Sequence, residues 1–125
     1  MVLGHLLQVA IGGALGASLR YLTGLAAIRL LGPGFPWGTL TVNVLGSAAM
    51  GAFIVLAANR GLTHLSPLVM TGLLGGFTTF SAFSLDVVSM LERDALGPAT
   101  LYVTASVVGG LLALLLGMVA ARSVL

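Results

Sequence analysis

Four long apolar stretches constrain the fold of this chain more than any other feature. Each is close to the ~20 residues that an α-helix needs to cross a bilayer. Only 6% of the 125 residues are charged, and 58% are hydrophobic. A soluble domain carries about 25% charged residues, because its surface must face water. We therefore expect a single all-α integral membrane domain, residues 1–125.

The ends of the spans are predicted where prolines, glycines and charges interrupt the apolar pattern. Gly32–Pro36 cannot continue a helix, Asn59–Arg60–Gly61 is a polar stop, and Glu92–Arg93–Asp94 returns the chain to water. Met1–Gly4 carries no Lys or Arg, which predicts a retained first helix rather than a signal peptide. The loops are short, so neighbouring helices are antiparallel. The predicted spans are residues 3–31, 37–58, 66–91 and 98–124.

The arginines at the ends of the spans are evenly divided between the two sides. Arg60 and Arg122 fall on the side of both termini, and Arg29 and Arg93 fall on the other. An excess of Lys and Arg on one side normally fixes orientation. Its absence predicts insertion in both orientations, and pairing of two opposed copies as a dual-topology, antiparallel homodimer. A single orientation fixed by lipid or by insertion kinetics is the alternative.

Small residues line one face of the fourth span. They recur at every fourth position, which lets another helix backbone approach closely. The first span has a shorter set of the same kind in Gly12 and Gly16. Such faces predict an oligomer, although they serve contacts within a subunit equally well. The residues of the fourth span are Ala105, Gly109, Ala113, Gly117 and Ala121.

Polar side chains inside a span either join helices or form a route for polar solutes. Thr39, Asn43 and Ser47 follow one face of the second span at intervals of four. Tyr102 and Ser106 lie one turn apart in the fourth. A lone hydroxyl is most often a hydrogen bond between helices. Asn43 is the strongest candidate for a functional role, since its amide has two donors and two acceptor sites.

The third span contains Gly75–Ser84, with paired glycines followed by Thr and Ser. Each glycine weakens a helix by about 1 kcal/mol, which predicts a break at mid-membrane. Freed carbonyl oxygens from two copies could converge on a small hard cation such as Na⁺. Close packing of the glycines is an equal alternative. Phe80 and Phe83 share a face, and the positive edges of their rings could line a dry passage for an anion.

Arg20 is the only basic residue deep in a span. A charge there costs about 3 kcal/mol or more unless it faces water or a partner. We expect it to draw anions into a vestibule, with extension to the membrane interface as the alternative. Asp86, near the end of the third span, is predicted to be either a partner for Arg20 or a boundary residue.

Three stretches together resemble the signature sequences of the Fluc (CrcB) family of bacterial fluoride channels. They are Gly12–Tyr21, Gly38–Gly46 and Gly75–Ser84. The resemblance extends over nearly the whole chain in the right order and spacing. It implies a fluoride-selective channel of the bacterial inner membrane that exports fluoride passively from the cytoplasm and protects against its toxicity.

The resemblance also implies roles for individual residues. Gly75 and Thr78 would hold a structural Na⁺ on the dimer axis through their backbone carbonyls. Arg20 would lie near the vestibule, and Gly110 stands where the family often has another Ser in its polar track. The residues implied to line the fluoride pore are Asn43, Phe80, Phe83, Thr39, Ser106 and Tyr102.

Two other classes of protein fit a four-span chain of this length. A proton-coupled small multidrug exporter needs a membrane-embedded carboxylate in its first helix, and this first helix has no acidic residue. A non-transporting membrane scaffold would leave the polar stripe of the second span as joins between helices. An enzyme is not expected, because no nucleophile–base pair, metal cluster or phosphate-binding loop is present.

Overall fold

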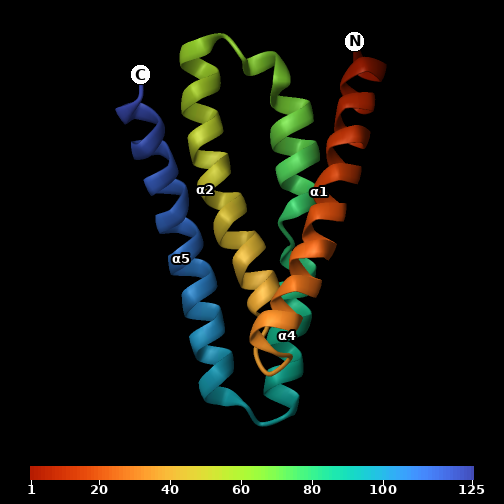
Figure 1. Cartoon of the computed structure of the whole chain (residues 1–125), viewed down its shortest axis with the longest axis vertical. Helices are drawn as coiled ribbons and strands as arrows, with labels where there is room; N and C mark the ends of the chain where they lie inside the picture. The colour runs from red at the N-terminus through yellow and green to blue at the C-terminus, as the bar shows by residue number, and fades with distance from the viewer.

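The computed structural model describes residues 1–125 and is entirely helical (Figure 1). Four segments are long and apolar enough to cross a membrane. The third of them, Thr63–Glu92, is called the third span below; it is bent and consists of η1, η2, α3 and α4. Both termini lie at one end of the molecule (Figure 1). The elements are α1 Val2–Leu31, α2 Trp37–Arg60, η1 Thr63–Leu65, η2 Pro67–Leu74, α3 Gly75–Phe77, α4 Phe80–Glu92 and α5 Leu96–Ser123.

Glycines with positive φ angles end the first two helices. Gly61 has φ 67° and its N–H donates to the Ala57 carbonyl, so the predicted stop after α2 is confirmed. Gly32 has φ 80° and its N–H donates to Ile28. A residue with a side chain is strained at such φ values, whereas glycine is not. The chain can therefore reverse direction within a few residues.

α2 and α5 pack against each other through their small residues. A methyl group on Gly51 would collide with the Leu114 carbonyl oxygen, and one on Gly117 would collide with the Ala48 carbonyl oxygen. Ala113 and Ala121 of the same face are buried. The small-residue face of the fourth span thus serves a contact within the subunit, one of the two alternatives left by the sequence.

α1 packs against the third span by the same means. A methyl group on Gly12 would collide with the Leu68 carbonyl oxygen, and one on Gly16 would collide with the Leu73 carbonyl oxygen. In return, a methyl group on Gly76 would lie 2.8 Å from the Gly13 carbonyl oxygen. The two backbones are therefore in direct contact, in agreement with the packing alternative for the paired glycines.

The third span is interrupted at Thr78 and Thr79 rather than at the glycines. Gly75 and Gly76 are helical, whereas Thr78 has ψ 159° and Thr79 has φ −152° and ψ 115°. The glycines are needed for contact with α1, and two extended β-branched residues form the bend. Ahead of it, η2 is a π-helix, a wider coil often found at functional sites.

The outer surface is largely apolar. Only 15 of the 125 residues are buried, and large aliphatic side chains are exposed along all four spans. A chain with so little interior has its hydrophobic side chains solvated by lipid or covered by another membrane protein.

Candidate functional site

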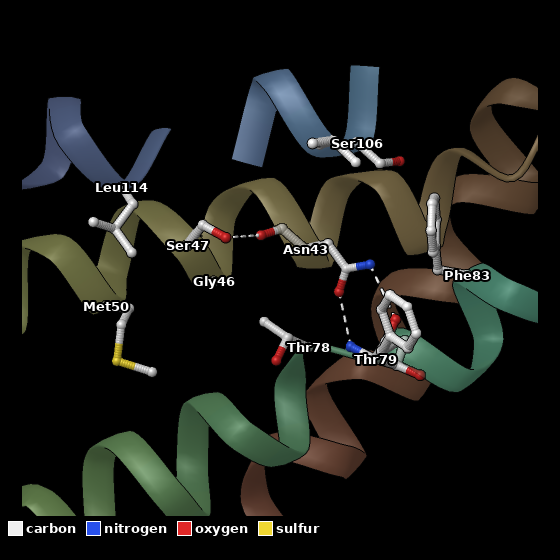
Figure 2. Close-up of a pocket in the computed structure, with 11 residues that line it drawn as sticks. Asn43, Gly46, Ser47, Met50, Thr78, Thr79, Phe83, Ser106 and Leu114 are labelled. Carbon is white, nitrogen blue, oxygen red and sulfur yellow. Dashed lines mark hydrogen bonds between the residues drawn. The ribbon is translucent and has the colours of Figure 1, made fainter. Parts of the chain in front are cut away.

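The bend in the third span is tied to α2 by a pair of hydrogen bonds (Figure 2). Asn43 donates through Nδ2 to the Thr79 carbonyl oxygen at 3.1 Å, and its Oδ1 accepts from the Thr79 N–H at 2.7 Å. One amide side chain therefore satisfies both backbone groups of the extended residue. The cost of unpaired backbone in an apolar environment explains why an Asn stands here.

The two threonines of the bend also bond locally. Thr79 caps α4, because its Oγ1 accepts from the Ala82 N–H at 3.1 Å. Thr78 donates through Oγ1 to the Leu74 carbonyl oxygen at 2.9 Å. Thr favours such side-chain bonds at helix ends. The sequence thus defines the end of one helix and the start of the next without proline.

A pocket of about 380 Å³ lies beside the bend, between α2, α4 and α5 (Figure 2). It brings together four of the six residues predicted to line a pore: Asn43, Phe80, Phe83 and Ser106. Ser106 Oγ is buried and has no hydrogen-bond partner. A buried hydroxyl without a partner costs about 1–3 kcal/mol, so this atom is poised to bond a polar occupant of the pocket.

The two phenylalanines have different surroundings. Their ring centroids are 5.7 Å apart, but Phe80 is 79% exposed on the surface of the chain. Phe83 instead packs against Tyr102, with ring centroids 5.2 Å apart. Phe83 is therefore fixed by the subunit itself, whereas the outer side of Phe80 is open to lipid or to another chain.

Tyr102 and Thr39 do not line this pocket. Tyr102 is fully buried, and its hydroxyl donates to Asp86 Oδ2 at 2.8 Å. Thr39 and Asp86 line a second pocket of about 390 Å³ near the α1–α2 turn. The prediction that Asp86 pairs with Arg20 is wrong in this chain, because the carboxylate bonds the tyrosine on α5.

Arg20 reaches the third span from α1. Its Nε donates to the Gly76 carbonyl oxygen at 3.0 Å, and the side chain is half-buried. It also lines a pocket of about 280 Å³ together with Thr39 and Thr79. Arg20 thus bonds to the backbone two residues ahead of Thr78, a contact that sequence reasoning did not anticipate.

Ser47 is a pocket residue that was not among the predicted site residues. It lines the same pocket as Asn43 and donates through Oγ to the Asn43 carbonyl oxygen at 2.7 Å (Figure 2). Its place one turn after Asn43 on a polar helix face was the available signal. Ser47 Oγ also lies 3.6 Å from where a Cβ on Gly110 would stand. Its hydroxyl is therefore close to the position where the family often has another Ser.

The fold and the site define a helical multi-pass membrane protein with a polar pocket at a bent span. Residues 7–118 match the family described as CrcB-like protein, Camphor Resistance (CrcB). The chain is 65% identical over 120 residues to a protein of a Ruegeria species named Fluoride-specific ion channel FluC. The match covers 95% of each chain. It belongs to the CrcB family and is a multi-pass protein of the bacterial inner membrane.

Relatives of the same name extend the match. One from Roseobacter denitrificans is 58% identical over 95% of this chain and 96% of its own. One from Mesorhizobium japonicum is 52% identical over 95% of this chain and 97% of its own. The family match at residues 7–118 therefore reaches all four spans.

Proposed function

We propose that the protein is a fluoride-specific ion channel. The observation that carries the proposal is the pocket beside the bend, where the buried Ser106 hydroxyl has no partner and shares the space with Asn43 and two phenylalanines. The relatives named as fluoride channels match 95% of this chain. Fluoride is strongly hydrated, so a pore must replace its water with closely placed donors.

Further donors beside this pocket support the proposal. Phe80 and Ser81 are the first residues of α4, so their N–H groups have no acceptor within that helix. Asn43 uses one of its amide hydrogens on Thr79 and keeps the other. The start of α4 also carries the positive end of the helix dipole. We infer that fluoride passes this group of donors, with Phe80 and Phe83 lining the path, and Thr39 and Tyr102 extending it.

Transport is passive and directed outward. Hydrogen fluoride is a weak acid that enters a cell from an acidic medium and releases fluoride in the near-neutral cytoplasm. An open path lets the anion leave, driven by the inside-negative potential. This requires no nucleotide and no coupled ion, so the protein acts as a channel rather than as an enzyme or exporter, and it protects the cell from fluoride.

The functional unit is a dual-topology, antiparallel homodimer. Arg60 and Arg122 lie at one end of the spans, and Arg29 and Arg93 at the other, so the charge bias that fixes orientation is absent. Phe80 is 79% exposed beside the pocket. A second copy on this face would complete the lining around its ring. The bend then lies at mid-membrane, near the two-fold axis.

The carbonyl groups at the bend fit a structural Na⁺. In a continuous helix the Gly75 and Thr78 carbonyls would accept from the N–H groups of residues 79 and 82, but these donate to Asn43 Oδ1 and Thr79 Oγ1. Gly75 lies on the exposed face. Unpaired carbonyls in a membrane are tolerated when they face protein, water or a cation. The same oxygens from two copies would hold the ion on the axis, where it supplies positive charge and joins the subunits.

Fluoride efflux from proteoliposomes tests the channel assignment. An ion-selective electrode would follow efflux of fluoride and of chloride, with Na⁺ present or replaced by a large organic cation. Rapid efflux that is selective for fluoride and needs Na⁺ is the expected result. Efflux of both anions would contradict the fluoride assignment. No efflux from folded protein would favour a scaffold or an exporter, in which case binding of lipophilic cations near Asp86 would be measured next.

A further inference from the structure

We propose that Arg20 is a positioning residue whose Nε–H holds the Gly76 carbonyl and thereby fixes the bend of the third span. This role differs from that of a charge in a vestibule. It rests on the proposed channel function for its effect on transport, but the contact itself is a property of the fold. The argument starts from the face of α1 on which Arg20 lies.

Gly12, Gly16 and Arg20 follow one another at intervals of four, so they share one face of α1. Gly12 contacts the backbone at Leu68 and Leu73, and Gly16 contacts it at Leu73 and Phe77. Each step along α1 thus moves one turn along the third span. Arg20 stands at the next step, where the third span stops being helical. A pocket of about 280 Å³ lies there between Arg20 and Thr79, and the long arginine side chain reaches the Gly76 carbonyl.

The Gly76 carbonyl has lost its helical partner. In a continuous helix it would accept from the N–H of residue 80, but the extended Thr78 and Thr79 interrupt the helix between the two residues. Arg20 Nε donates to it at 3.0 Å instead. A freed carbonyl in an apolar setting costs several kcal/mol when left unpaired. The arginine therefore replaces the bond that the bend removes.

The bend is held from both sides. Arg20 on α1 binds the carbonyl of Gly76, and Asn43 on α2 binds both backbone groups of Thr79. Only Phe77 and Thr78 lie between these two anchors. The direction in which α4 leaves the bend, and with it the position of Phe80, is therefore set by two side chains from two different helices. Loss of either anchor lets the donors beside the pocket move.

Two substitutions separate positioning from charge. Arg20→Gln removes the charge but keeps an N–H donor at the same number of bonds from the backbone as Nε. Arg20→Lys keeps the charge but puts a methylene group at that position. Arg20→Met is the matched control with neither. Positioning predicts that Gln retains fluoride efflux, while Lys and Met lose it about tenfold, as expected when a hydrogen bond from a charged group is lost.

The efflux rates are compared per folded protein in the same liposomes. We expect a higher efflux rate for Arg20→Gln than for Arg20→Lys and Arg20→Met. A Lys variant that equals or exceeds Gln would overturn the proposal and assign Arg20 to anion attraction. Equal loss in Gln and Met, or wild-type rates in all three, would also overturn it, because the donor would then make no difference.

A measurement on the unmodified chain avoids variants that fail to fold. Solid-state NMR in bilayers, with ¹⁵N-labelled arginine and glycine labelled at its carbonyl carbon, detects the Arg20 Nε to Gly76 dipolar coupling directly. Dephasing consistent with the 3.0 Å hydrogen bond is expected. Absence of this coupling in folded protein would overturn the proposal. The result is independent of fluoride transport, so failure of the channel assignment and failure of the positioning role are distinguishable.

Discussion

The molecule contains two helix pairs that pack closely through glycines but differ in whether both of their partners are continuous helices. In the α2–α5 pair, Gly51 and Gly117 bring two continuous helices into backbone contact. In the α1–third-span pair, Gly12 and Gly16 do the same against a chain that is bent. The first pair has all of its helical bonds along the contact. The second exposes backbone groups that must be satisfied by side chains.

The difference shows how a short membrane chain combines rigidity with an irregular site. Glycine contacts alone hold helices together but supply no polar groups. At the bend, Arg20 and Asn43 add the polar anchors, and each comes from a helix that is itself continuous. The α2–α5 pair therefore acts as a frame, and the bent span is the part whose geometry decides transport.

The largest expected effect comes from disrupting the Asn43–Thr79 hydrogen bonds, which link the α2–α5 pair to the third span. Asn43→Asp removes the donor to the Thr79 carbonyl and sets a negative charge beside the pocket. Like charges at close range cost several kcal/mol, so fluoride efflux should fall more than about 100-fold. Proteoliposome efflux measures it. Asn59→Asp is the matched control at the exposed end of α2 and should conduct normally. Unaltered efflux in Asn43→Asp would mean that Asn43 lies off the path.

A methyl group on one glycine of each pair tests the comparison itself. Gly16→Ala and Gly117→Ala should each lower stability by about 1–3 kcal/mol, because both force a Cβ into a neighbouring carbonyl. Thermal denaturation in detergent would measure this loss. Efflux per folded protein should fall at least about tenfold in Gly16→Ala alone, since displacements of about 1 Å matter only at the site. Equal losses of efflux in both would remove the distinction between frame and site.

Replacement of the phenylalanines separates an aromatic lining from packing. Phe80→Ile and Phe83→Ile should each slow fluoride efflux by up to about tenfold, the value of an aromatic contact of about 0.5–1.5 kcal/mol. Only Phe83→Ile should also lower the melting temperature, because Phe83 packs on Tyr102 while Phe80 is exposed. Cross-linking would check that the dimer persists. Wild-type rates in both variants would remove the rings from the path.

The smallest effect is expected at Gly110 on α5, in the helix pair that forms the frame. A Cβ on Gly110 would stand 3.6 Å from Ser47 Oγ, an ordinary contact distance, so Gly110→Ser fits without movement. It adds one hydroxyl where Ser47 already supplies one, and the efflux rate should change by less than about threefold, below one neutral hydrogen bond. Gly110→Ala is the control for size. A large loss in Gly110→Ser alone would show that Ser47 does not serve this position.

The sequence predicts the spans well because each signal is local. Apolar length marks the helices, and Gly61 marks the end of α2 through its own backbone freedom. The third span was expected to begin at residue 66, and η2 begins at Pro67 with Ser66 as its N-cap. The preceding turn at Thr63–Leu65 was not predicted. Such short turns depend on the loop rather than on periodicity, so helix ends are read less reliably than helix centres.

The site was predicted in part, for reasons that are also physical. Asn43, Phe80, Phe83 and Ser106 do share a pocket. The paired glycines predicted irregular backbone in the right segment, but the bend falls at Thr78 and Thr79 because the glycines are used against α1. The partners of Arg20 and Asp86 depend on how helices distant in sequence are placed. No spacing rule within one helix contains that information.

The π-helix ahead of the bend is more loosely wound than the α-helical part of the third span. Its bonds run from each residue to the fifth one on, so Pro67–Leu74 holds more residues per turn than an α-helix does. Loss of one residue there could be absorbed by tightening the coil, with the bend still opposite Arg20 and Asn43. The same loss within α4 would rotate Phe83 away from Tyr102. The two halves of the third span should therefore differ sharply in their tolerance of deletions.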